Sequence, residues 1–183
     1  MRVEHTSLAD VLLFRPSPHR DERGFFTRTF DAEVVASAGL DPAAFVQDSQ
    51  SRSAHGTLRG LHGRNGAGEA KLVRCAHGAI LDVIVDARPD SPTFGQHQAF
   101  RLDDEDFCLL YVPRGFLHGF QVLSGVADIC YRIDRPHDPA EDLSVRHDDA
   151  DLAIGWPLPA GILSPRDRSA GSWRDLLAGD VRG

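Results

Sequence analysis

Short segments with the composition of β-strands follow one another between residues 56 and 133, and this run constrains the fold more than any other feature. Glycine, proline and aspartate separate the segments, and these residues favour turns. A parallel βαβ arrangement would need crossovers of about a dozen residues, for which this stretch has no room. We therefore predict an all-β jelly roll. The predicted strands are Lys71–Ala76, Ala79–Ala87, Gln96–Leu102, Phe107–Val112, Leu117–Val122 and Val126–Ile133.

Helices are expected to be few and short. The segment Asp31–Leu40 has an acidic first turn and a stop signal at Gly39, which favours a helix. A second helical turn is predicted at Trp173–Leu177. The length of 183 residues suits one domain with a sizeable core, and the sequence contains neither repeats nor low-complexity blocks. We expect a single domain over residues 1–183.

Charge, hydropathy and cysteine content exclude several classes of protein. A net charge of −7 does not support a broad basic face for nucleic acid. The apolar runs Ala79–Val85 and Phe107–Val112 are far shorter than the roughly 20 residues of a membrane span, and no secretory signal is seen at the start. Cys75, Cys108 and Cys130 lie in apolar segments, which predicts reduced core thiols in a cytoplasmic protein.

Two of the nine histidines, His62 and His118, stand in apolar stretches flanked by glycine, and a buried imidazole needs hydrogen-bond partners. Residues 113–118 read PRGFLH and fit the second cupin motif, P-x-G-x-x-H, whose histidine points into the barrel. In metal-binding cupins an H-x-H pair and a glutamate complete the site. Here Gly60 stands two residues before His62, so we expect no metal; a metalloenzyme of the oxygenase type would use His62, His118 and Glu69.

Strand alternation indicates which polar side chains face the interior. In Val126–Ile133 it places Tyr131 on the apolar face that should line the barrel. The same counting puts His62 on one face of its strand and Arg59 on the other. A bulge at Gly60 would bring Arg59 to the side of His62, and the sequence leaves both arrangements open.

The residues expected in the barrel suit proton abstraction next to a ketone. His62 would remove the α-proton, and the chain's single lysine, Lys71, would stabilise the enolate. Arginine-rich codon usage would also explain why 19 arginines accompany one lysine. Tyr131 would reprotonate the opposite face. A carboxylate behind His62 would fix its tautomer, and Asp167 is a candidate that sequence logic alone would not select.

Motifs along nearly the whole chain, from about residue 5 to 175, together resemble the dTDP-4-dehydrorhamnose 3,5-epimerases and the related deoxysugar epimerases of antibiotic pathways. The combination of motifs is highly specific. The segments that carry the resemblance are DERGFF (21–26), FVQDSQS (45–51), LRGLH (58–62), KLVRCAHG (71–78), DVIVDARPDSPTFG (82–95), VPRGFLHGFQVLS (112–124), Tyr131-Arg132, IGWP (154–157) and LSPRD (163–167).

The resemblance implies a cupin-type double-stranded β-helix, or jelly roll, that forms homodimers by exchanging N-terminal strands and uses no cofactor. The substrate would be a nucleotide-diphospho-4-keto-6-deoxyhexose, inverted at C3, or at C3 and C5. The resemblance implies His62 as base paired to Asp167, Lys71 as enolate-stabilising cation and Tyr131 as acid. The residues implied in substrate binding are Arg23, Phe26, Arg28, Gln47, Ser49, Arg59, His118 and His137. Among them, Arg23 and Arg59 would contact the phosphates.

Several positions depart from the family pattern. Residues 63–64 read Gly-Arg in place of an aromatic and glutamine, and residues 69–70 read Glu-Ala in place of Gln-Gly, with a loop one residue shorter. We expect the glycine to remove a wall of the sugar pocket. Arg28 replaces a glutamate near the expected site of the nucleotide base, and Ser49 replaces an asparagine. We therefore expect an altered substrate scope and a preference for epimerisation at C3. A nucleotide-sugar-binding cupin without turnover is the other alternative.

Overall fold

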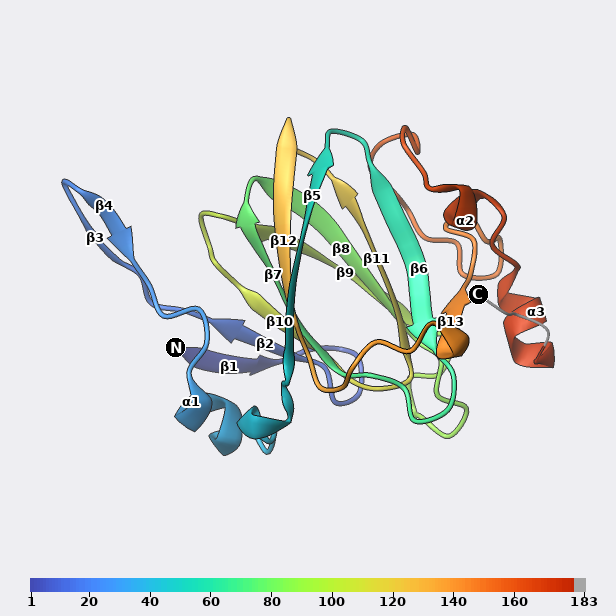
Figure 1. The fold of residues 1–183 in the computed structure, drawn as a ribbon, viewed down its shortest axis with the longest axis horizontal. Coiled ribbons are helices and arrows are strands. Elements are labelled where there is room, and N and C mark those ends of the chain that lie inside the picture. Colours follow the sequence, from blue (N-terminus) through green and yellow to red (C-terminus); the bar gives the residue numbers. More distant parts are fainter. Residues whose placement is uncertain (180–183) are drawn as a thin grey trace.

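A computed structural model describes residues 1–179, and most of it consists of two antiparallel β-sheets (Figure 1). The first sheet has six strands and collects its members from both halves of the chain. Such an order, in which neighbours in the sheet are distant in sequence, is typical of jelly rolls. In spatial order its strands are β1 (Arg2–His5), β2 (Leu12–Arg15), β10 (Leu109–Val112), β7 (Lys71–His77), β12 (Val126–Ile133) and β5 (Gln47–Ala54).

The second sheet has five strands, and the largest apolar cluster lies between the two sheets. Val73, Leu110 and Ile129 of the first sheet pack in this cluster with Ile84 and Phe120 of the second. Burial of each such side chain contributes about 1.5–3 kcal/mol. In spatial order the strands are β13 (Asp142–Ser144), β6 (Leu58–Arg64), β11 (Phe116–Val122), β8 (Ala79–Asp86) and β9 (His97–Asp103).

The prediction of an all-β, cupin-type jelly roll with a few short helices is confirmed. The six predicted strands correspond to β7 through β12, and their ends differ by at most two residues. The strands before residue 56, as well as β6 and β13, lay outside the predicted segments. The predicted single domain over residues 1–183 stays a prediction.

The helices are short, and two of them pack against the outer faces of the sheets. Asp31 caps the N-terminus of the first helix, whose buried Val35 packs against Leu72 and Leu109. Among residues 1–179, every helix is too short or too polar to span a bilayer. Both predicted helices are present, and the helices are α1 (Ala32–Ser37), η1 (Pro42–Ala44), η2 (Pro139–Glu141), α2 (Pro165–Arg168) and α3 (Trp173–Ala178).

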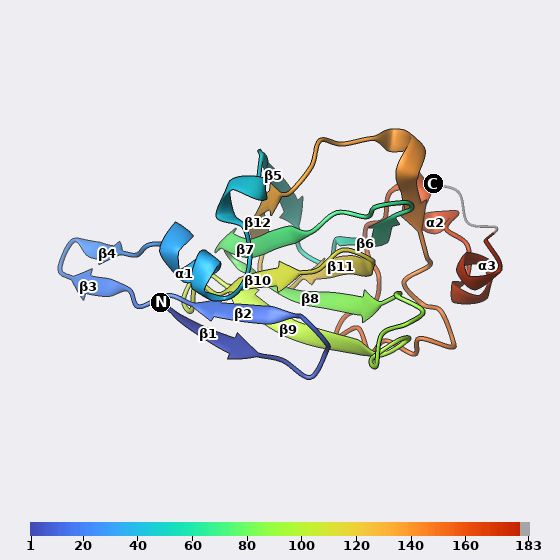
Figure 2. The same ribbon diagram turned by 90° about the horizontal axis from the view of Figure 1, so that it is seen from below.

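A two-stranded hairpin, β3 (His19–Asp21) and β4 (Gly24–Phe26), extends beyond both sheets, as both views show (Figures 1 and 2). Phe25 contacts Phe107 with ring centroids 4.4 Å apart. Phe26 is 70% exposed. A lone two-stranded ribbon is marginally stable in water, and an exposed phenylalanine on it would gain from further burial.

The three cysteines are unpaired, as the sequence predicts, but they do not share one environment. Cys75 and Cys108 are buried thiols. Cys130 is half-buried and lies beside Arg74 in a hollow on the outer side of the six-stranded sheet. The prediction of a core thiol is therefore wrong for Cys130, because its position on β12 is out of phase with Tyr131, which faces the interior.

Candidate functional site

A cavity of about 260 Å³ opens between the two sheets, and it is lined from both of them. It collects an ammonium, a guanidinium, two imidazoles and a phenol. A cavity with a few convergent polar groups is the usual form of a small-molecule site. The lining residues are Ser51, Arg59, His62, Lys71, His118, Phe120, Tyr131 and Ile133.

A bulge in β6 brings Arg59 and His62 into the same cavity. The pairing of β6 with β11 shifts register between His118 and Phe120. Gly60 lies at this irregularity with a φ of 131°, and a Cβ there would come within 2.5 Å of the Cα of Gly119. Only glycine permits such a close approach of two backbones. Of the two arrangements that the sequence left open, the bulged one is present.

Asp167 lies directly behind His62. The Nε2 of His62 is 2.6 Å from Oδ1 of Asp167, whose side chain is 2% exposed. Ser164 caps α2 and accepts a hydrogen bond from the Asp167 backbone N–H, which fixes the carboxylate at the start of the helix. Burial raises the pKa of Asp167, but hydrogen bonds to the carboxylate, that of His62 above all, outweigh it and lower that pKa overall. The carboxylate is therefore ionised. It favours the His62 tautomer that carries its proton on Nε2, which leaves Nδ1 free to accept a proton.

Tyr131 faces His118 and Ser51 inside the cavity. Its hydroxyl is 3.2 Å from the Ser51 Oγ, and its ring meets that of His118 edge-on at 6.3 Å. Burial raises the pKa of Tyr131 above its usual value of 10.0, so the phenol is protonated at neutral pH. His118 in turn is 2.8 Å from Asp82, which is fully buried.

The sequence reasoning missed Ser51 and Asp82. Ser51 follows from alternation along β5, because Gln47 and Ser49, both predicted in substrate binding, lie on the same face of that strand. Asp82 interrupts an otherwise apolar strand, and a carboxylate in such a place requires a partner. Gln47 and Ser49 are not among the residues that line the cavity.

Lys71 begins β7 and contacts a carboxylate that the sequence reasoning had considered as a metal ligand. Its Nζ is 2.8 Å from Oε1 of Glu69. The second oxygen of Glu69 lies 2.7 Å from Nε of Arg64, although the N–H does not point along this contact. The carboxylate of Glu69 thus pairs with two cationic side chains. Within residues 1–179, no cluster of three or more His, Cys, Asp or Glu side chains is arranged to hold a metal ion.

Besides Gln47 and Ser49, four further predicted substrate-binding residues lie outside the cavity in the single chain. Arg23 and Phe26 are exposed on the projecting hairpin, where Arg23 pairs with the neighbouring Asp21. Arg28 is exposed as well and pairs with the helix cap Asp31. The fourth, exposed His137, lies beside Arg64 rather than in the cavity. The chain alone therefore brings together the predicted catalytic residues and only part of the predicted binding residues.

Gly63 does not open the cavity, and the expectation that it removes a wall of the sugar pocket is wrong. A Cβ at this position would lie 2.9 Å from Cδ2 of Leu117 and 3.0 Å from Cδ1 of Leu143. Both leucines belong to an apolar cluster on the outer side of the five-stranded sheet. A larger side chain at residue 63 would press into that cluster and leave the cavity unchanged.

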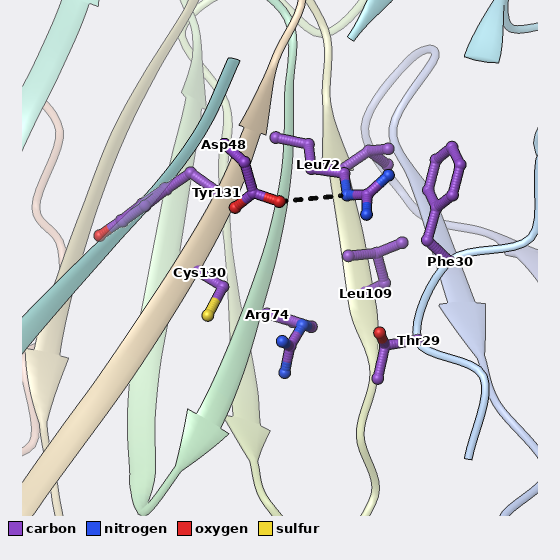
Figure 3. A pocket seen from close by; sticks show the side chains of 9 residues that line it. Thr29, Phe30, Asp48, Leu72, Arg74, Leu109, Cys130 and Tyr131 are labelled. Atoms are coloured by element: carbon purple, nitrogen blue, oxygen red, sulfur yellow. Dashed lines mark ion pairs between the residues drawn. The ribbon is translucent and has the colours of Figure 1, made fainter. Parts of the chain in front are cut away.

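A second, smaller hollow of about 50 Å³ lies on the outer side of the six-stranded sheet (Figure 3). Figure 3 shows Cys130 and Arg74 at this hollow, while the ring of Tyr131 turns away from them. The pair Arg132–Asp48, at 3.6 Å, closes one side. Because residues alternate along β12, this outer hollow and the cavity lie on opposite sides of the strand.

Comparison with known proteins gives the same family along nearly the whole chain. The profile of the dTDP-4-dehydrorhamnose 3,5-epimerases matches residues 5–175. The dTDP-4-dehydrorhamnose 3,5-epimerase of Escherichia coli K12 is 41% identical over 179 residues, which is 97% of each chain.

Solved structures agree with this result. The crystal structure of a dTDP-6-deoxy-D-glucose-3,5-epimerase from Legionella pneumophila in complex with dTDP-4-keto-L-rhamnose matches with a TM-score of 0.91 and 37% identity, over 99% of this chain and 97% of that one. A 3′-monoepimerase from Streptomyces bikiniensis in complex with dTDP-quinovose matches with a TM-score of 0.89 and 32% identity, over 97% and 91%. The chain thus belongs to the dTDP-4-dehydrorhamnose 3,5-epimerase family of isomerases.

Proposed function

We propose that the protein is a cofactor-independent epimerase that acts at C3, or at C3 and C5, of a nucleotide-diphospho-4-keto-6-deoxyhexose in deoxysugar biosynthesis. The substrate is dTDP-4-keto-6-deoxyglucose or a derivative, and the enzyme works in the cytoplasm. The observation that carries this proposal is the arrangement of the His62–Asp167 pair, Lys71 and a protonated Tyr131 around one cavity. The dTDP-4-keto-L-rhamnose bound to the Legionella relative supports the class of substrate.

The first step is removal of the proton next to the 4-keto group. Nδ1 of His62 takes the proton, and Asp167 stabilises the imidazolium that forms. The electrons of the broken C–H bond move into the enolate, whose oxygen is met by the ammonium of Lys71. A preorganised charge of this kind stabilises the developing oxyanion without further reorganisation.

The second step returns a proton to the opposite face of the ring. His62 stands on β6 of one sheet and Tyr131 on β12 of the other, so the two groups approach the cavity from different sheets. The Tyr131 hydroxyl donates its proton to the carbon, the enolate collapses to the ketone and the configuration is inverted. The resulting phenolate is a strong base because burial disfavours its charge, and exchange with solvent restores both groups.

Binding of the nucleotide diphosphate is expected to use two chains. Arg59 lies in the cavity, where its Nε donates to Ser53, and it offers a guanidinium to a phosphate. Arg23 and Phe26 reach a cavity only if the hairpin of one chain crosses to another. We therefore propose a homodimer with exchanged N-terminal strands, which also covers the exposed hairpin.

The test is incubation of the protein with dTDP-4-keto-6-deoxyglucose in D₂O, with deuterium read separately at C3 and C5. The proposal expects solvent deuterium at C3, and deuterium at C5 as well if both centres invert. Binding of the sugar nucleotide without deuterium at either carbon would contradict it and favour a binding protein without turnover. Loss of activity after treatment with a chelator, restored by a divalent metal, would favour the metal-dependent alternative.

A further inference from the structure

Charges of alternating sign, buried at the end nearest the cavity, connect the cavity to helix α2. Lys71 meets Glu69, Glu69 meets Arg64, and Arg64 lies 3.8 Å from Asp142. Asp142 also pairs with Arg166 of α2 at 2.9 Å, and the next residue of that helix is Asp167, the partner of His62. The members of this charge chain are Lys71, Glu69, Arg64, Asp142 and Arg166.

The first three members are almost entirely removed from solvent. The side chains of Arg64, Glu69 and Lys71 are 3%, 8% and 14% exposed. Buried charges hold their place only while they are paired, because an uncompensated charge is strongly disfavoured there. Three cations and two carboxylates leave one net positive charge in the chain, and Lys71 is the member that faces the cavity.

The charge chain also crosses between the two sheets. Arg64 ends β6, the strand that carries His62, whereas Glu69 lies two residues before the start of β7, the strand that carries Lys71. β6 belongs to the five-stranded sheet and β7 to the six-stranded sheet, and they share no backbone ladder. The Arg64–Glu69 pair therefore links the strand of the base to the strand of the cation.

We propose that Glu69 is a positioning residue that fixes the ammonium of Lys71 at the cavity, and that Arg64 fixes Glu69. A lysine ammonium is a point charge on a flexible four-carbon stem, so without an anchor it samples many positions. With Glu69 in place, the ammonium is held where the enolate oxygen forms. This inference rests on the proposed function, in which Lys71 stabilises the enolate.

The first test does not depend on activity and uses the fact that Lys71 is the only lysine of the chain. Protein labelled with ε-¹³C-lysine gives one side-chain methylene signal. The proposal expects two inequivalent Hε resonances in the wild type, because the stem is fixed, and a single averaged resonance in Glu69→Gln. Averaged Hε resonances in the wild type, or inequivalent ones in Glu69→Gln, would overturn the proposal while leaving the epimerase function untouched.

The second test separates kcat from KM. Glu69→Gln is expected to lower kcat by roughly 10- to 100-fold with little change in KM, because a misplaced cation weakens the transition state more than the bound sugar. The double variant Arg64→Gln/Glu69→Gln removes the stranded guanidinium but still lacks the carboxylate that anchors Lys71, so its kcat should stay as low as in the single variant. Unchanged kcat in the single variant, or recovery of kcat in the double variant, would contradict the proposal.

A matched control is available close by. Glu141 pairs with Arg135 and contacts neither Lys71 nor Arg64. Glu141→Gln removes the same charge from another, more exposed ion pair and should leave both kcat and the lysine signal as in the wild type. Thermal unfolding of each variant shows which of them are folded. If Glu69→Gln is unstable, the double variant still provides the test, because it has no unpaired charge at residues 64 and 69.

Discussion

The cavity between the sheets and the β3–β4 hairpin both carry residues that the family resemblance assigns to the reaction, but they are built in opposite ways. In the cavity, each polar group is held by another: His62 by Asp167, His118 by Asp82. On the hairpin, Arg23 pairs only with the neighbouring Asp21, and nothing covers Phe26 among the described residues.

This difference suggests that the cavity carries out the reaction and that the hairpin contributes to substrate recognition. Catalytic groups must be preorganised to within a fraction of an ångström, and the jelly roll provides that order within one chain. Recognition groups on a ribbon gain their order only on contact with another surface. Changes in the cavity should therefore affect turnover, whereas changes on the hairpin should affect binding and assembly.

The largest effect is expected in the cavity. His62→Ala removes the base and should lower kcat by roughly 10²- to 10⁴-fold, the usual contribution of general acid–base catalysis. Exchange of the α-proton with D₂O should fall in parallel. His97, exposed on β9, offers a matched control, and His97→Ala should behave as the wild type. Exchange at the wild-type rate in His62→Ala would remove His62 from the role of base.

Tyr131→Phe should distinguish the two faces of the ring. The variant keeps the base and the cation, so exchange of the α-proton should survive better than net inversion, which needs the phenol. Nuclear magnetic resonance of the sugar in D₂O measures both rates in one sample. If exchange and inversion fall by the same factor, the two-face mechanism is wrong.

On the hairpin we expect a smaller effect of a different kind. Arg23→Ala removes a charge-assisted contact to a phosphate, worth about 1.5–3 kcal/mol, and should raise KM by roughly 10- to 100-fold with kcat nearly unchanged. Arg146→Ala, at another exposed arginine paired with a neighbouring aspartate, is the control. A loss confined to kcat would show that the hairpin belongs to the chemistry rather than to recognition.

The smallest effect concerns ionisation and appears as a shift along the pH axis. Burial raises the pKa of both tyrosines, Tyr131 and Tyr111, above their usual value of 10.0. Because these pKa values are higher in the folded than in the unfolded state, the two phenols contribute to folding stability. This contribution is fully present below the unfolded-state pKa of about 10, and it is lost as pH rises through the folded-state pKa values. Absorbance at 295 nm should therefore stay low in the folded protein at pH 10 and rise on unfolding; full tyrosinate absorbance in the folded protein would contradict the burial of both phenols.

The sequence predicted the parts of the fold in which one face of each strand is apolar. The strands β7 to β12 have this pattern, and their bounds were predicted to within two residues. The strand β5 reads QDSQSRSA and was missed, because one of its faces lines a polar cavity and the other meets solvent. Alternation therefore carries no hydrophobic signal there.

The site was predictable only in part, for reasons of distance and local geometry. His62 and Asp167 are 105 residues apart, and only the family resemblance brought them together. The placement of Arg59 depended on a bulge that alternation cannot decide. The unusual residues Arg64 and Glu69 were noted separately, whereas the fold makes them partners. Gly63 was placed at the sugar pocket from the family pattern, although it follows the inward-facing His62 and alternation puts it on the outer side of β6.

The central claim is that the catalytic groups come from one chain and part of the recognition from another. Such an assembly should run in solution at about 40 kDa, twice the 20.0 kDa chain. A mass of 20 kDa at micromolar concentration would already exclude a shared site.

Subunit complementation tests the claim most directly. His62→Ala and Arg23→Ala are each impaired alone, and they are mixed after dissociation and reassociation. If the hairpin crosses between chains, each mixed dimer contains one site with an intact cavity and an intact hairpin, and random mixing should restore about one quarter of the wild-type activity at low substrate concentration. If each hairpin serves its own chain, no site is complete, and activity no higher than the mean of the two separate variants would contradict the account.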